Sequence, residues 1–383
     1  MRRDAVHLRV VFPDGTAHNR WLKGADVNIG IIGLPQTGKK TLFKLLVGPA
    51  ALRLHTDPRA VHRGVVDVQD PRFDRLVEIY TPRKQTRARL EVVLLPKIEE
   101  DAVRQGDILK DMGEVDAFCH VVRAFGDDSV YHVWGGPDPA REVEFVQSEF
   151  LLHDLLFVEK RLERLESDLK KAKDERREKE RALLLRLRGH LESEKPLRQL
   201  ELPREERVVI ASYPFLTLGQ MIVALNISED RIGDESFLGS FRERFQGRGL
   251  SFAQIAMRTE AEIADLATEA ERTEFMAAIG IEENALHLLT AKLIEAVGLM
   301  SFFTAAHNEL RQWFVRRGAL APEAAGVIHT DMERGFIRAE VVNYADIIAH
   351  GSEEAVKAAG KYHVKGKDHV IEDGDILNIR FSV

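Results

Sequence analysis

Hydrophobic residues in the first two thirds of the chain gather in short uninterrupted runs, with segments of helical character between several of them. The runs occupy residues 28–32, 65–68, 90–95, 117–122 and 221–225. Runs of this length are typical of strands that are buried on both faces. Their alternation with helices predicts an α/β domain, in which a mainly parallel sheet carries helices on both faces.

A coiled-coil pattern interrupts this alternation. Apolar residues are spaced alternately three and four apart at Leu155, Val158, Leu162, Leu165, Leu169 and Ala172. A charge-dense stretch at 170–181 follows, and Leu184, Leu187 and Leu191 form a second apolar seam before Pro196. Two such seams joined by a polar segment predict an antiparallel helical hairpin that projects from the α/β domain. The sequence favours neither a partner-binding arm nor a merely solvated one.

The pattern changes again near residue 301. Short apolar segments, Gly and Asp-Gly turns and one helical stretch at 344–359 predict a small α+β domain. We therefore divide the chain into an N-terminal extension (1–26, with a candidate strand at 8–12), a first part of the α/β domain (27–142), the helical insertion (143–206), a second part (207–300) and the C-terminal domain (301–383).

Composition narrows the class of protein. The 383-residue chain has a formal net charge of −7, which argues against general coating of nucleic acid but leaves room for a local basic face. Its one cysteine, Cys119, cannot form an intrachain disulfide, which fits a reducing compartment. No apolar stretch approaches the roughly 20 residues of a membrane span. We expect a cytoplasmic protein without membrane contact.

The segment GLPQTGKKT, which directly follows the first predicted strand, contains the candidate chemistry. Gly33, Gly38 and Lys39 have the spacing of a P-loop, GxxxxGK followed by Ser or Thr. In that motif, backbone N–H groups and the N-terminus of the next helix bind phosphate oxygens, and the lysine reaches the β and γ phosphates. A strand before the loop and a helix over residues 41–47 are the required context.

One position departs from the motif. Lys40 stands where the hydroxyl residue that ligates magnesium is expected, and Thr41 comes one residue later. One residue turns a helix by about 100°, so the Thr41 hydroxyl should point away from the usual metal position. The sequence thus predicts a retained phosphate cradle and impaired binding of Mg²⁺.

Several longer segments carry a family resemblance. NIGIIGLPQTGKKTLFKLL and residues 113–133, 154–166, 321–341 and 366–383 resemble, in this order, the Obg-like ATPases of the YchF type. These are TRAFAC-class P-loop proteins. The resemblance implies a G domain, an inserted coiled-coil hairpin and a C-terminal TGS domain. It also implies a cytoplasmic protein that binds ATP in preference to GTP and associates with ribosomes.

The resemblance extends to base recognition. Family members carry NxxE in place of the guanine-reading NKxD, and NISE at 226–229 matches it. An Asp carboxylate pairs with the N–H donors of guanine, so its loss removes the preference for GTP. The resulting nucleotide-binding candidates are Gly33, Gln36, Thr37, Gly38, Lys39, Lys40, Thr41, Asn226, Ile227 and Glu229.

Two further departures from the family concern hydrolysis. The DxxG loop, which supports magnesium and the γ-phosphate, reads Leu94-Leu95-Pro96-Lys97 here. The threonine-bearing switch has no counterpart in register before Gly64, although Thr56 lies nearby. We expect weak hydrolysis or none, and assign no catalytic or metal-binding residue. An active ATPase with an altered metal shell and a nucleotide-free scaffold remain the alternatives.

The C-terminal domain contains a candidate RNA-binding surface. Four of its arginines, Arg316, Arg317, Arg334 and Arg338, lie near the aromatic residues Trp313, Phe314 and Phe336 in sequence. Such residues can contact phosphates and stack on bases. A solvated face with the aromatic residues in the core explains the pattern equally well. For His62, His120, His329 and Cys119, structural roles are favoured over catalysis.

Overall fold

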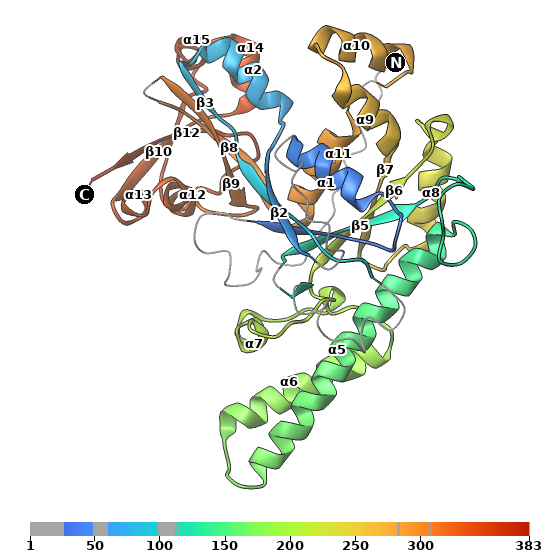
Figure 1. The fold of residues 1–383 in the computed structure, drawn as a ribbon. Coiled ribbons are helices and arrows are strands. Elements are labelled where there is room, and N and C mark those ends of the chain that lie inside the picture. Colours follow the sequence, from blue (N-terminus) through green and yellow to red (C-terminus); the bar gives the residue numbers. More distant parts are fainter. Residues whose placement is uncertain are drawn as a thin grey trace.

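Two six-stranded sheets organise the molecule. The computed structural model describes residues 27–48, 60–98, 112–113, 115–281, 284–306 and 308–382. The candidate strand at 8–12 and Thr56 lie outside the described residues. Figure 1 shows the two sheets side by side and the helical arm extending away from the first.

The first sheet is mainly parallel, as predicted. Its strands, in spatial order, are β2 (His62–Asp67), β4 (Arg89–Leu94), β1 (Asn28–Ile32), β5 (Ala117–Arg123), β6 (Gln220–Asn226) and β7 (Leu250–Ile255). Only β2, of these strands, pairs antiparallel with its neighbour. The strand order reverses at β1, which lies between β4 and β5. In open α/β sheets such a reversal creates a crevice at the carboxyl ends of the strands.

Helices cover both faces of this sheet. On one face, α1 (Lys39–Val47) and α11 (Ala285–Ala296) bury Leu42, Phe43, Leu289 and Leu293 against the strands. On the other face, the start of α5 (Pro139–Leu169) and α8 (Glu235–Arg244) contribute a second set of apolar side chains. Helices α9 (Met257–Asp265) and α10 (Glu269–Ala278) lie beyond α1. Four of the five apolar runs read from the sequence are therefore strands buried on both faces. The run at 65–68 is the exception, because it falls in the edge strand β2, where Val65 is 54% exposed.

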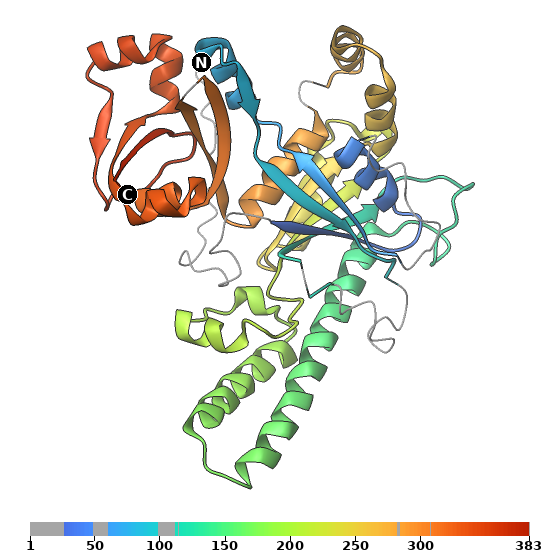
Figure 2. The same cartoon turned by 60° about the vertical axis from the view of Figure 1, so that its left-hand side comes forward.

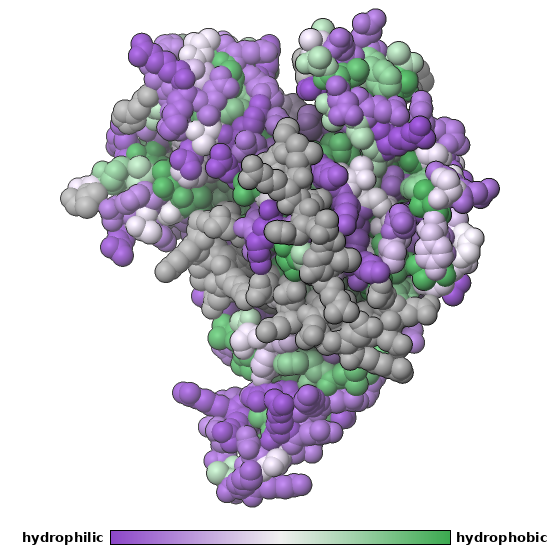
Figure 3. Space-filling view, viewed as in Figure 1, coloured by the Kyte–Doolittle hydropathy of each residue, from purple (hydrophilic) through white to green (hydrophobic). Residues whose placement is uncertain are grey.

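The predicted arm is the antiparallel pair α5 and α6 (Glu175–Glu192). Figure 2 shows the pair projecting from the sheet. The second predicted seam and the middle of the first are buried between the helices, as Val158, Leu162, Leu165, Leu184, Leu187 and Leu191. At the ends of the first seam, Leu155 and Leu169 are half-buried, and Ala172 is exposed beyond the end of α5. The surface of the arm is predominantly hydrophilic toward its tip (Figure 3).

A buried carboxylate fixes the arm to the domain. Asp154 accepts hydrogen bonds from the backbone N–H groups of Leu216 and Thr217, at 2.9 and 2.8 Å, and from the Thr217 hydroxyl, at 2.6 Å. These residues lie just before β6, and α7 (Arg204–Ile210) packs nearby at the base of the arm. Because hydrogen bonds to a buried charge are strong, Asp154 anchors α5 to the central sheet.

The C-terminal domain has α+β architecture, as predicted. Its sheet has the order β11 (His363–Lys365), β10 (Phe336–Val342), β12 (Ile376–Phe381), β8 (Leu299–Ala306), β9 (Glu309–Arg316) and β3 (Lys84–Thr86). Helices α12 (Ala321–Ile328) and α13 (Thr330–Arg334) pack on it. The predicted single helical stretch at 344–359 is wrong in one respect: it forms two helices, α14 (Tyr344–His350) and α15 (Glu353–Ala358). Gly351 ends α14 with a φ of 78°.

Strand β3 joins this sheet although it comes from the first part of the chain. It pairs in parallel with β9, and α2 (Pro71–Tyr80) packs Phe73 and Leu76 into the core of the C-terminal domain. Arg72 binds both Asp70 and Asp373, at 2.9 and 3.2 Å. The segment between β2 and β4 thus couples the two sheets.

Candidate functional site

The segment Gly33 to Lys39 is folded as a phosphate-binding loop between β1 and α1. Gly33 has a φ of 148°, and a Cβ there would lie 2.4 Å from the Val121 carbonyl oxygen. Gly38, at the N-cap of α1, has a φ of 102°, and a Cβ there would lie 2.6 Å from the Asn226 amide nitrogen. Positive φ and the close neighbouring atoms therefore require glycine at both positions, as the P-loop prediction implies.

A cavity of about 1460 Å³ opens over this loop. The segments that follow β1, β4, β5, β6 and β7 all contribute to its lining. The cavity therefore lies in the crevice that the strand order creates. Of the ten candidate residues, only Gly33 does not line it; the nine that do are Gln36, Thr37, Gly38, Lys39, Lys40, Thr41, Asn226, Ile227 and Glu229.

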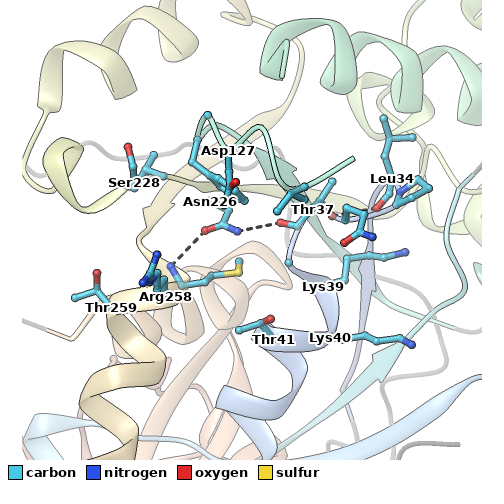
Figure 4. Close-up of a pocket in the computed structure, with 18 of the residues that line it drawn as sticks. Leu34, Thr37, Lys39, Lys40, Thr41, Asp127, Asn226, Ser228, Arg258 and Thr259 are labelled. Atoms are coloured by element: carbon cyan, nitrogen blue, oxygen red, sulfur yellow. Dashed lines mark hydrogen bonds between the residues drawn. The ribbon is translucent and has the colours of Figure 1, made fainter. Parts of the chain in front are cut away.

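Asn226, the last residue of β6, joins the phosphate loop to helix α9. Its side-chain nitrogen donates to the Thr37 carbonyl at 3.0 Å, and its side-chain oxygen accepts from the Met257 N–H at 3.3 Å (Figure 4). The side chain is 6% exposed. One amide thus binds the phosphate loop to the N-terminus of α9, a positioning role that the sequence motif does not reveal.

Lys39 is the most perturbed cation of the cavity. Its side chain is 8% exposed, and its Nζ donates to the Pro96 carbonyl at 3.2 Å. Burial, together with the smaller effects of the charges of Lys40 and Lys97, lowers the pKa of Lys39 to about 7. A buried cation with a lowered pKa gains a favourable partner when an anion enters, so the loop suits phosphate.

The opposite side of the cavity contains the residues of the NISE motif. Ile227 is buried against α8, whereas Glu229 is exposed and begins the 3-10 helix Glu229–Arg231. Phe125, Ile232 and Met257 add apolar surface there. An apolar pocket with a few polar groups is typical of a base-binding site.

The lining residues that the sequence did not indicate include Asp127, Met257, Arg258 and Thr259. They belong to the segments after β5 and β7, and Figure 4 shows Asp127, Arg258 and Thr259 on the Asn226 side of the cavity. Only their position directly after buried strands could have indicated them, because parallel strands end at one edge of the sheet.

The metal-binding chemistry of a P-loop enzyme does not fit these residues. Mg²⁺ prefers oxygen ligands, but Lys40 occupies the hydroxyl position and Leu94, 3% exposed, occupies the carboxylate position. Thr41 leaves α1 in a different direction from Lys40 (Figure 4). Among the described residues, no group of three His, Cys, Asp or Glu side chains is arranged to hold a metal ion.

The remaining candidates lie outside the cavity, apart from His62. Cys119 and His120 are fully buried in β5, and burial lowers the His120 pKa to about 3. His329 accepts the Asp331 N–H and caps α13. In the C-terminal domain, Phe314 and Phe336 are 3% and 5% exposed. These two aromatic residues lie in the core, whereas Trp313 is half-buried, and RNA contact by this surface stays a prediction.

Sequence comparison identifies relatives of this chain. A Bacillus subtilis (strain 168) protein, "Ribosome-binding ATPase YchF", is 37% identical over 366 residues, covering 92% of this chain and 99% of the relative. The chain belongs to the YchF family. Its Escherichia coli O157:H7 relative of the same name is 36% identical over 362 residues, again covering 92% and 99%. "Obg-like ATPase 1" of Oryza sativa subsp. japonica is 34% identical, covering 93% and 92%.

Structure comparison agrees with this assignment. The YchF GTPase of Schizosaccharomyces pombe superposes with a TM-score of 0.77 at 30% identity, covering 93% of this chain and 98% of that one. The family model YchF-GTPase_C, described as "Protein of unknown function (DUF933)", matches residues 299–382, which begin at β8. This YchF-family chain thus has the family's fold over nearly its whole length. In the part of the chain that the structure describes, no helix is long and apolar enough to cross a bilayer.

Proposed function

We propose that this chain is a cytoplasmic, ribosome-associated P-loop protein that binds ATP in preference to GTP and hydrolyses it weakly. The observation that carries the proposal is the phosphate loop, which lines a large cavity. Its Thr37 carbonyl accepts a hydrogen bond from Asn226, the first residue of the NISE motif. The names of its relatives, ribosome-binding ATPases, support the ligand and the partner.

The preference for ATP rests on the segment after β6. Glu229 takes the place of the Asp that pairs with guanine in NKxD proteins, and it is exposed at the rim of the cavity. A longer side chain at the start of a 3-10 helix moves the carboxylate from the position that guanine requires. Adenine, which lacks those N–H donors, loses nothing by this change.

Weak hydrolysis follows from the electrostatics of the loop. Phosphoryl transfer requires positive charges that are positioned against the transferred phosphoryl group, and a nucleophile that is held in the right orientation. Lysines stand near the phosphate position here, but Leu94 and Leu95 supply no carboxylate after β4. The chain would hold nucleotide well and turn it over slowly.

The arm and the C-terminal domain are the proposed ribosome contacts. The arm is long, polar at its surface and fixed to the sheet through Asp154. On the C-terminal domain, Arg334 and Arg338 are exposed. Because Phe314 and Phe336 are buried, the contact would use charge rather than base stacking.

Calorimetric titration of ATP and GTP, followed by co-sedimentation with ribosomes, tests the proposal. We expect ATP to bind at least tenfold tighter than GTP, a difference of about 1.4 kcal/mol. Turnover should be close to that of a Lys39→Ala variant. Rapid magnesium-dependent turnover would favour an active ATPase, and absence of binding at millimolar nucleotide would favour a scaffold.

A further inference from the structure

Three lysine side chains line the phosphate end of the cavity. Lys39 and Lys40 belong to the first turn of α1, and Lys97 belongs to the segment after β4. All three line the same cavity. Figure 4 shows the side chains of Lys39 and Lys40 extending from the helix in the same direction.

The segment that carries Lys97 is held against the phosphate loop on both sides. The carbonyl of Pro96 accepts from Lys39 Nζ at 3.2 Å, and the N–H of Ile98 donates to the Gly33 carbonyl at 3.2 Å. Ile98 is 1% exposed and packs in the core with Leu34. Two anchored neighbours therefore place Lys97 at the loop, although its side chain is exposed.

Among the described residues, the charged side chains at the phosphate end of the cavity are basic. Lys40 and Lys97 both act on the buried Lys39 amine strongly enough to lower its pKa. The acidic residues that line the cavity are Asp127, Glu229, Asp230 and Glu262. These described residues belong to the segments after β5 and β6 and to α9, and within the described part of the chain none belongs to the phosphate loop or to residues 95–98 after β4.

We propose that Lys40 and Lys97 take the place of the divalent cation, so that this site binds the metal-free nucleoside triphosphate in preference to its magnesium complex. The inference rests on the proposed nucleotide binding and concerns the ionic form of the ligand. Lys40 stands at the position of the metal-ligating hydroxyl, and Lys97 at that of the residue that contacts the γ-phosphate.

The physical reason is a balance of charge and ligation. Lysine ammonium groups attract the terminal phosphates as point charges. Mg²⁺ bound to the triphosphate cancels two of the negative charges that these lysines attract. Protein oxygen ligands that contact the metal would offset this loss of attraction, and Lys40 and Leu94 supply none. Magnesium therefore weakens binding here, whereas it strengthens binding where a hydroxyl and a carboxylate are present.

Calorimetric titration of the full chain with ATP, in EDTA and in excess magnesium at matched ionic strength, tests the proposal. We expect ATP to bind at least threefold tighter in EDTA. In EDTA, Lys97→Ala should weaken ATP binding roughly tenfold, the size of a lost charge-assisted contact. AMP, which lacks the terminal phosphates, should be affected less than twofold.

Two further variants make the test specific. Lys44→Ala removes an exposed lysine of α1 that does not line the cavity, and it should leave ATP affinity unchanged. Lys40→Ser restores the hydroxyl, and it should shift the preference toward the magnesium complex. Tighter binding of ATP in magnesium, or equal effects of Lys97→Ala and Lys44→Ala, would overturn this inference alone. Absence of ATP binding in both buffers would overturn the proposed function and this inference with it.

Discussion

Replacing Lys39 by methionine should stabilise the nucleotide-free protein and abolish nucleotide binding. Methionine keeps the length and volume of the buried stem but carries no charge. In the folded chain, burial and the neighbouring Lys40 and Lys97 lower the Lys39 pKa from 10.5 to about 7. In the unfolded chain the Lys39 pKa keeps its ordinary value. Folding at neutral pH must therefore either release the proton of the Lys39 amine or bury the charged amine.

The size of this cost follows from the pKa. At 1.36 kcal/mol per pH unit, the lowering from 10.5 to about 7 corresponds to an upper bound of about 4 kcal/mol at pH 7. Methionine leaves the Pro96 carbonyl without its donor at 3.2 Å, which costs about 1 kcal/mol. Water entry and local relaxation reduce the electrostatic gain, so we expect a net stabilisation of about 1–3 kcal/mol.

The pH dependence gives the decisive sign. Between pH 7 and pH 9 the unfolded lysine stays protonated while the folded one loses its proton, so the wild-type protein becomes more stable as pH rises. The advantage of the variant should therefore shrink by up to about 2 kcal/mol over this range. Urea denaturation followed by tryptophan fluorescence in EDTA measures it. A Lys44→Met control, on the exposed side of α1, should show no such trend. A variant that is less stable at pH 7, or whose advantage is independent of pH, would refute the reasoning.

Three other substitutions test the loop and the arm. Gly38→Ala places a Cβ 2.6 Å from the Asn226 amide and should weaken nucleotide binding at least tenfold by calorimetry; Gly48→Ala, also at positive φ but with no atom within 4 Å, should leave binding intact. Asn226→Ala frees the phosphate loop from α9 and should also cost roughly tenfold in affinity, so unchanged binding would show that the amide does not hold the loop. Asp154→Ala leaves two backbone donors unsatisfied near Thr217 and should destabilise this region by about 3 kcal/mol. Amide exchange that rises there, and not on the sheet, would localise that effect.

Much of the fold could be predicted from local sequence patterns, because these patterns have physical causes that act between residues close together in the chain. Short apolar runs identified β1, β4, β5 and β6 within a few residues, since a strand buried on both faces has no polar positions to offer. Leucines spaced three and four residues apart predicted the α5–α6 pair, because an apolar seam on one helix must be buried against a partner helix. The glycines at Gly33 and Gly38 indicated the loop, as their backbone conformations exclude a side chain.

Relations between distant segments required the tertiary structure. Strand β3 carries only three residues, and it forms a strand because β9, more than two hundred residues later, offers a free edge. Lys97 reads in the sequence as the loss of a glycine, whereas in space it joins Lys39 and Lys40 at one cavity. Asn226 reads as a base-recognition residue, whereas its amide binds the phosphate loop. The sequence by itself determined which segments become strands, seams and a phosphate loop, because spacing and backbone sterics act within a few residues. Which side chains share a site was decided only by the order of the strands, because that order brings the ends of distant segments to one edge.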